Sequence, residues 1–220
     1  MTTTAVRFVL VLGLVSTGAA LASDRDFPVD PGRLAMRSTP KGLKVKLQFR
    51  KGSVAMPGAE SPLRDGAFLH IFNSNGGTDA VCAPMPVGNW RVSRVDPSTG
   101  PVGWTYSDAR NVNGPVRHAH FGAVGRNGYG DLRVIMQGPS TYTLDETSQG
   151  TIAASFRVKN LLPSPNPDHT RYCTDFAPPY VTVTQDQSGS FRALFASQYG
   201  GPCPPAPGPC SPGGAFLDAD

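Results

Sequence analysis

Short segments in which apolar and polar residues alternate set the strongest limit on what this chain can fold into. Residues 43–49 alternate without a fault, and residues 152–158 carry a second apolar stripe of period two. This pattern is typical of a β-strand with one buried face, because successive side chains point to opposite sides. The residues that we expect in the core are Ile152, Ala154, Phe156 and Val158, with Thr151, Ala153, Ser155 and Arg157 on the opposite face.

Turn signals separate these segments. Asn75-Gly76 and Asn127-Gly128 are typical of β-turns, and the chain has 25 glycines and 22 prolines among its 220 residues. Both residue types interrupt helices, and no segment of 12 residues after the N-terminal region has the period of a helix. Further segments with strand character are 67–72, 90–95, 102–106, 116–121, 132–136, 171–176, 180–184 and 191–195, together with Tyr142 and Leu144, which alternate with threonines.

About ten short strands with turns between them predict an all-β fold. The pattern is typical of a single antiparallel β-sandwich or a partly closed barrel, and the length suits one domain with a core of its own. We expect residues 23–42 to be an irregular lead-in, residues 43–199 to be the β-sandwich domain, and residues 200–220 to be a Pro/Gly-rich tail.

The first 22 residues predict a secretory signal peptide. Arg7 supplies a positive charge, and an apolar run follows over residues 8–15. Ala20 and Ala22 form a small-x-small cleavage site before Ser23. The run is too short for a bilayer span, which takes about 20 residues. We therefore expect cleavage after Ala22, no later transmembrane segment, and a mature protein that is secreted or periplasmic.

All four cysteines, Cys82, Cys173, Cys203 and Cys210, follow the expected cleavage site. An even number in an exported protein favours two disulfides over free thiols. The chain has no CxxC pattern, so nothing indicates a redox site. A zinc site is also disfavoured, because such sites normally have closely spaced pairs of ligands. The spacing leaves all three pairings open, of which Cys203–Cys210 is the simplest local one.

The pattern His118-Ala119-His120 is the sharpest local signal for a ligand. Residues two apart on a strand share a face, so both imidazoles could bind one zinc or copper ion. No spacing nominates a third ligand, and the glutamate that follows the HxH pattern of cupins is missing. A solvent-facing histidine pair is the simpler interpretation, so we expect no structural metal. A metal-binding protein that uses His118 and His120 remains an alternative function. We expect His70, in an apolar strand, to be a core residue.

Motifs for catalysis are missing from the chain. It has no GxSxG, HExxH, P-loop or GxGxxG pattern, so we expect neither an enzyme nor a cofactor. Trp90, Trp104 and Tyr106 could line a sugar-binding surface, which gives a carbohydrate-binding module as a second alternative, although such residues more often belong to the core. The net charge of +4 is too small and too scattered to indicate a nucleic-acid partner.

A longer series of motifs resembles a known group of proteins. In chain order these are Trp104-x-Tyr106-x-Asp108, Gly114-Pro115, Leu132-Arg133, Gly138, Tyr142-Thr143-Leu144-Asp145-Glu146, Ser148-Gln149-Gly150, Arg171-Tyr172-Cys173-x-x-Phe176 and Cys203-Pro204. Over roughly residues 43–205 the chain is similar to an uncharacterised secreted β-sandwich module of delta-type proteobacteria and related environmental bacteria. The module has no established activity, so the resemblance implies fold and export but no catalytic residue.

The resemblance also implies a disulfide pairing. The tyrosine–cysteine strand and the late cysteine–proline pair persist in the module, which implies Cys173–Cys203 and ties the tail to the domain. Cys82 and Cys210 are then left for each other. The module often has cysteines at the positions of Val116 and Met136, which implies that these two strands lie side by side.

Together these observations predict a secreted, non-catalytic binding or structural module. Its ligand is unknown at this point, and a protein or a glycan outside the cytoplasm is the candidate partner.

Overall fold

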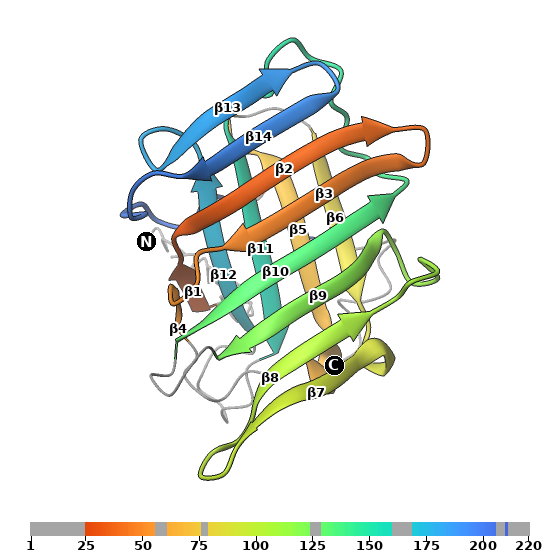
Figure 1. The fold of residues 1–220 in the computed structure, drawn as a ribbon, viewed down its shortest axis with the longest axis vertical. Coiled ribbons are helices and arrows are strands. Elements are labelled where there is room, and N and C mark those ends of the chain that lie inside the picture. The colour runs from red at the N-terminus through yellow and green to blue at the C-terminus, as the bar shows by residue number, and fades with distance from the viewer. Residues whose placement is uncertain are drawn as a thin grey trace, which may run out of the picture.

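The computed structural model describes residues 25–55, 61–75, 79–123, 129–159, 169–205 and 210. The expected signal peptide of residues 1–22 and its cleavage site lie outside these residues. Within them the chain forms two β-sheets packed face to face (Figure 1), in agreement with the predicted all-β class. Neither sheet closes on itself, so the sandwich is the correct one of the two expected architectures.

The smaller sheet has five strands, in the order β1 (Arg25–Pro28), β12 (His169–Phe176), β11 (Ile152–Lys159), β5 (Ala67–Asn73) and β6 (Ala80–Met85). Neighbouring strands are antiparallel except β1 and β12, which run parallel. An ion pair between Arg171 and Asp26 (Nη2 to Oδ2, 2.6 Å) joins these two strands.

The larger sheet has eight strands along its main path, all antiparallel to their neighbours. Their order is β13 (Val181–Gln187), β14 (Ser190–Phe195), β2 (Pro31–Thr39), β3 (Gly42–Phe49), β10 (Tyr129–Gly138), β9 (Val116–Ala123), β8 (Gly100–Ser107) and β7 (Trp90–Asp96). A two-residue strand, β4 (Val54–Ala55), also pairs with β10. The helical turns α1 (Pro62–Asp65) and η1 (Val87–Asn89) complete the fold. Among the described residues no helix is long and apolar enough to cross a membrane.

The hydrophobic core lies between the two sheets. Phe121 on β9 has its ring centroid 5.0 Å from that of Phe156 on β11 and 5.5 Å from that of Tyr172 on β12. Aromatic side chains of opposite sheets therefore pack against each other, as the alternation on β11 requires. The predicted inward residues of β11, namely Ile152, Ala154, Phe156 and Val158, are at most 1% exposed, which confirms that prediction.

The implied neighbourhood of two strands is also confirmed. Met136 on β10 is directly opposite Val116 on β9, and both side chains are fully buried. An apolar pair therefore stands at the place where the resembling module often has cysteines.

The prediction of an irregular lead-in at residues 23–42 is wrong. Most of this segment forms β1 and β2, so the sandwich includes strands from Arg25 onward. On β2, Leu34 and Met36 face the core, while Arg33 and Arg37 lie on the outer face. Its backbone pairs with β3 on one side and with β14 on the other. The next strand along the chain, β3, and the distant strand β14 thus supply the hydrogen bonds that hold β2 extended.

Two smaller differences concern the strand list. The sequence did not predict β6, which places Val81 and Met85 in the core. Pro84 interrupts its pattern, but an edge strand tolerates proline because one row of backbone N–H groups has no partner there. Tyr142 and Leu144 are buried, yet they form no strand.

Candidate functional site

Two disulfides, Cys173–Cys203 and Cys82–Cys210, attach the C-terminal tail to the smaller sheet, with Cα–Cα distances of 5.5 and 5.1 Å. These are the pairings that the resemblance implies, and the local Cys203–Cys210 pairing is not formed. Cys173 lies on β12 and Cys82 on β6, with β11 and β5 between them in the sheet. The tail is therefore fixed at two places across this sheet. Disulfides of this kind indicate an oxidising, extracytoplasmic environment.

The outer face of the smaller sheet is buried at its centre. Phe72, Ala153, Ser155 and His70 point away from the other sheet, yet they are 1%, 0%, 6% and 6% exposed. Part of the predicted opposite face of β11 is therefore buried as well. His70 is buried, as expected, but on the outer face of the smaller sheet and not in the core between the sheets. A ligand surface among the described residues is thus better sought on the larger sheet.

His70 makes the stability of the fold depend on pH. Burial lowers its pKa below the ordinary value of 6.5, and the positive charge of Arg171 adds to the shift. Below pH 6.5 the unfolded chain therefore binds the proton more readily than the folded chain. The contribution of neutral His70 to the free energy of unfolding is therefore complete above that pH. It is lost as the pH falls from there toward the pKa of the folded state.

We expect acidification from about pH 7.5 to about pH 5.5 to lower the free energy of unfolding, as measured by urea denaturation. A His70→Gln variant should lose less stability over the same interval, since its side chain does not titrate. If the two proteins lose the same amount, His70 is not the group responsible.

The aromatic residues proposed as a sugar platform are in the core. Trp90, Trp104 and Tyr106 are only 1%, 3% and 0% exposed. The indole Nε1 of Trp90 donates a hydrogen bond to the backbone carbonyl of Met85 (2.9 Å) inside the protein. The suggestion that these three side chains line a sugar-binding surface is therefore wrong, because they occupy the inward positions of β7 and β8.

The histidine pair lies on β9, on the outer face of the larger sheet. His118 is exposed and His120 is half-buried. The Nε2 atom of His120 is 3.4 Å from Oδ1 of the buried Asp131, whose Oδ2 is 2.8 Å from Nε of Arg133. Burial lowers the pKa of His120; Asp131 opposes this shift, and Arg133 and His118 add to it. The carboxylate next to His120 is thus already paired with a guanidinium.

As expected, the two histidines share one face of a strand. No group of three or more His, Cys, Asp or Glu side chains with the arrangement of a metal site occurs in the part of the chain that the structure describes. The metal-binding alternative stays a prediction.

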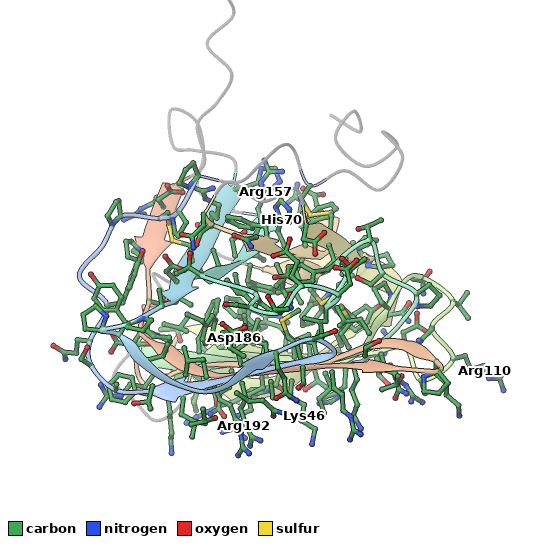
Figure 2. The ribbon with its side chains drawn as sticks, turned by 90° about the horizontal axis from the view of Figure 1, so that it is seen from above. Lys46, His70, Arg110, Arg157, Asp186 and Arg192 are labelled. Carbon is green, nitrogen blue, oxygen red and sulfur yellow. A yellow bond between two sulfur atoms is a disulfide. The ribbon has the colours of Figure 1, made fainter. Side chains whose placement is uncertain are left out.

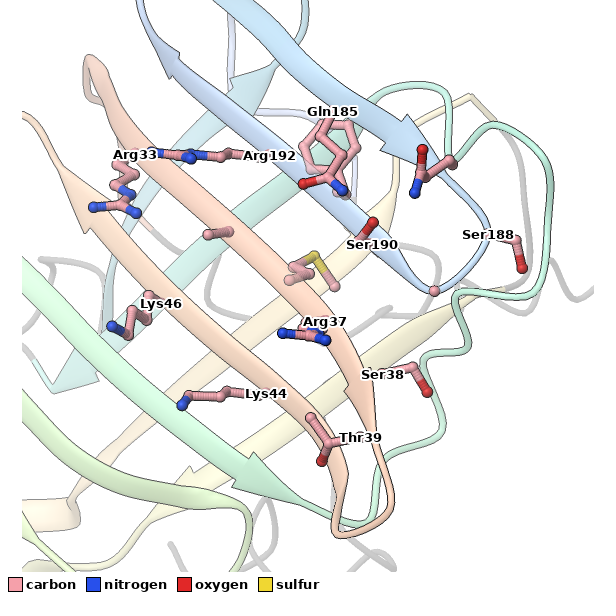
Figure 3. Close-up of a pocket in the computed structure, with 15 residues that line it drawn as sticks. Arg33, Arg37, Ser38, Thr39, Lys44, Lys46, Gln185, Ser188, Ser190 and Arg192 are labelled. Atoms are coloured by element: carbon pink, nitrogen blue, oxygen red, sulfur yellow. The ribbon is translucent and has the colours of Figure 1, made fainter.

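A groove lies on the outer face of the larger sheet, over β2, β3 and β14 (Figure 3). Its volume is about 880 Å³. Figure 2 shows Lys46 and Arg192 projecting from the side of the molecule opposite to His70. We name this groove the cationic groove because five cationic side chains line it, namely Arg33, Arg37, Lys44, Lys46 and Arg192.

The strand register places Ala35 in the middle of four of these cations. Arg33 and Arg37 precede and follow it by two residues on β2, on the same face. Lys46 on β3 and Arg192 on β14 are its direct partners in the sheet. Cβ atoms lie about 5 Å apart across strands and about 6.6 Å apart two residues along a strand. The short methyl group of Ala35 therefore forms a low floor within a ring of four long cations, which we name the four-cation ring.

Electrostatic repulsion is built into the groove. Arg37 is directly opposite Lys44 on the neighbouring strand, and like charges in that position destabilise a sheet. No carboxylate is among the described residues that line the groove. In addition, Nε of Arg33 is buried without a hydrogen-bond partner in the described structure. An anion bound among these cations would relieve this repulsion.

The sequence alone does not predict this groove. Lys44 and Lys46 occupy polar positions of the predicted strand at 43–49, and these two lysines on one face are the one feature of the sequence that points to the groove. Arg33 and Arg37 lie in the segment that was expected to be irregular, and Arg192 comes from a strand near the other end of the chain. The net charge of +4 gave no indication, because it averages over the whole chain.

Comparisons of the chain with protein-family models, with curated proteins and with solved structures gave no match. The two-sheet fold and the two disulfides agree with the resemblance to the secreted bacterial module. Membership of that group stays a prediction.

Proposed function

We propose that this chain is a secreted or periplasmic, non-catalytic binding module whose ligand is anionic. The observation that carries the proposal is the cationic groove, in which five cations lie on three adjacent strands of one open face. Groups of one charge on a surface raise the local concentration of oppositely charged partners and guide their approach.

The chemistry of the groove supports binding rather than catalysis. Its polar side chains besides the five cations are hydroxyls and amides, namely Ser38, Thr39, Gln185, Gln187, Ser188 and Ser190. General acid–base catalysis at neutral pH usually employs a histidine or a carboxyl group within reach of the substrate. Neither type is among the described residues that line the groove. Lysine, arginine, hydroxyl and amide groups together are well suited to hold an anion that also carries hydroxyl groups.

The test is binding to soluble anionic polymers. We expect the wild-type protein to bind dextran sulfate or carboxymethyl dextran at low salt and not to bind neutral dextran. A Lys44→Gln, Lys46→Gln double variant should bind at least about tenfold more weakly. The slope of log affinity against log salt should decrease in steepness by about one for each cation removed, because fewer counterions are released. Isothermal titration calorimetry over a range of salt concentrations measures both quantities.

A matched control removes the same charge elsewhere. Arg64 lies in α1 and Arg110 in the loop between β8 and β9, and both are exposed and outside the groove. An Arg64→Gln, Arg110→Gln variant should bind like the wild type. The proposal is overturned if the wild type binds neither anionic polymer, or if the control loses as much affinity as the Lys44, Lys46 variant.

A further inference from the structure

We infer that the four-cation ring around Ala35 is a subsite for the sulfate ester group of a polysaccharide. This inference rests on the proposed function and adds to it the class of polymer and the chemical group that is recognised. It starts from the register of three strands, which surrounds one small residue with Arg33, Arg37, Lys46 and Arg192.

The arrangement of the ring suits a tetrahedral oxyanion better than a carboxylate. A carboxylate is planar, has two oxygens, and is satisfied by one guanidinium in a fork-to-fork contact. A sulfate ester has three terminal oxygens that point in different directions, so it accepts hydrogen bonds from several sides at once. In the ring, cations stand on all four sides of a low floor, two along β2 and one on each neighbouring strand.

The remaining lining of the groove favours a polysaccharide over a membrane surface or a nucleic acid. Its two large apolar residues, Met36 and Phe191, are 2% and 1% exposed, so neither can enter a lipid layer or stack on a base. Hydroxyl and amide side chains stand at one end of the groove instead (Figure 3), where Ser38, Ser190 and Gln185 are drawn. These groups both donate and accept hydrogen bonds, as sugar hydroxyls require. An oxidising, extracytoplasmic environment is also one in which polysaccharides are encountered.

The experiment compares two polymers that share a backbone and differ in the anion. Dextran sulfate and carboxymethyl dextran are matched in length and in the number of charged groups, and the binding of each is measured by calorimetry. We expect the wild-type protein to bind dextran sulfate at least about tenfold more tightly, which corresponds to about one additional charge-assisted hydrogen bond.

An Ala35→Leu variant tests the floor of the ring without changing any charge. The larger side chain should lower the affinity for dextran sulfate by about tenfold and leave the affinity for carboxymethyl dextran nearly unchanged. Thr105→Leu is the matched control, because Thr105 lies on the same outer face, on β8, outside the groove. It should bind both polymers like the wild type.

A second pair of variants separates the ring from the rest of the groove and does not depend on the folding of Ala35→Leu. Arg192→Gln removes one member of the ring and should reduce the preference for sulfate. Lys44→Gln removes a cation outside the ring and should weaken the binding of both polymers by a similar factor.

The outcomes distinguish this inference from the proposed function. Equal binding of the two polymers by the wild type, or an unchanged preference in Ala35→Leu and Arg192→Gln, overturns the sulfate subsite while the binding module stands. Tighter binding of single-stranded DNA or of vesicles that contain anionic phospholipid than of dextran sulfate overturns the choice of a polysaccharide. Failure to bind any anionic polymer overturns both.

Discussion

Replacement of Phe156 by alanine is expected to lower the free energy of unfolding by about 3–5 kcal/mol. The side chain is fully buried between the sheets, where its ring centroid lies 5.0 Å from that of Phe121 and 6.5 Å from that of Trp90. Truncation removes buried apolar surface and leaves a cavity that rigid aromatic neighbours from the other sheet fill only in part. Urea denaturation of the two proteins measures the difference.

Val95→Ala is the control for this prediction. Val95 lies on β7 and is 62% exposed, so its truncation should change stability by no more than about 0.5 kcal/mol. A loss of less than about 1 kcal/mol for Phe156→Ala would mean that Phe156 does not hold the two sheets together.

Removal of the Cys82–Cys210 disulfide is expected to cost about 5 kcal/mol. This bridge spans 128 residues of sequence, whereas Cys173–Cys203 spans 30. In the chain-entropy account, a cross-link that closes a longer loop restricts the unfolded chain more, and the shorter bridge is worth about 4 kcal/mol. Double alanine variants of each pair, compared by denaturation under non-reducing conditions, give the two values.

Peptide mapping without reductant comes first in this experiment, because it establishes the two pairings in the wild-type protein. A peptide in which Cys203 is joined to Cys210 would contradict both bridges. If the Cys173, Cys203 variant proves the less stable of the two, loop length does not decide the order, and local packing at Cys173, which is 1% exposed, is the larger effect.

The sequence predicted those strands in which the alternation of apolar and polar residues within the strand itself shows which side is buried. The stripe on β11 was correct because each of its four apolar residues lies on one side of a strand, and period two is readable from a few residues. The same reasoning failed for β2, where only Leu34 and Met36 mark the inward face. Two arginines, a proline and a glycine surround them, so the segment becomes a strand through its pairing with β3 and β14.

The cationic groove could not be predicted for a similar reason. Its cations belong to β2, β3 and β14, and the pairing of β14 with β2 joins two segments that are far apart in the sequence. Alternation shows that Lys44 and Lys46 share a face, but it does not show which strand lies beside them. For Trp90, Trp104 and Tyr106 the residue type alone was informative. Such residues more often belong to the core, and all three are buried.

The hairpin of β13 and β14 covers one edge of β2. β14 pairs with β2 from Leu194 opposite Arg33 to Ser190 opposite Arg37, so it covers the central part of one side of a nine-residue strand. A fragment that ends before Val181 lacks this hairpin and presents β2 as a bare edge. Unpaired N–H and C=O groups on such an edge pair with other chains. Proteolytic loss of the last hairpin would therefore turn the strand at the centre of the binding face into a template for aggregates.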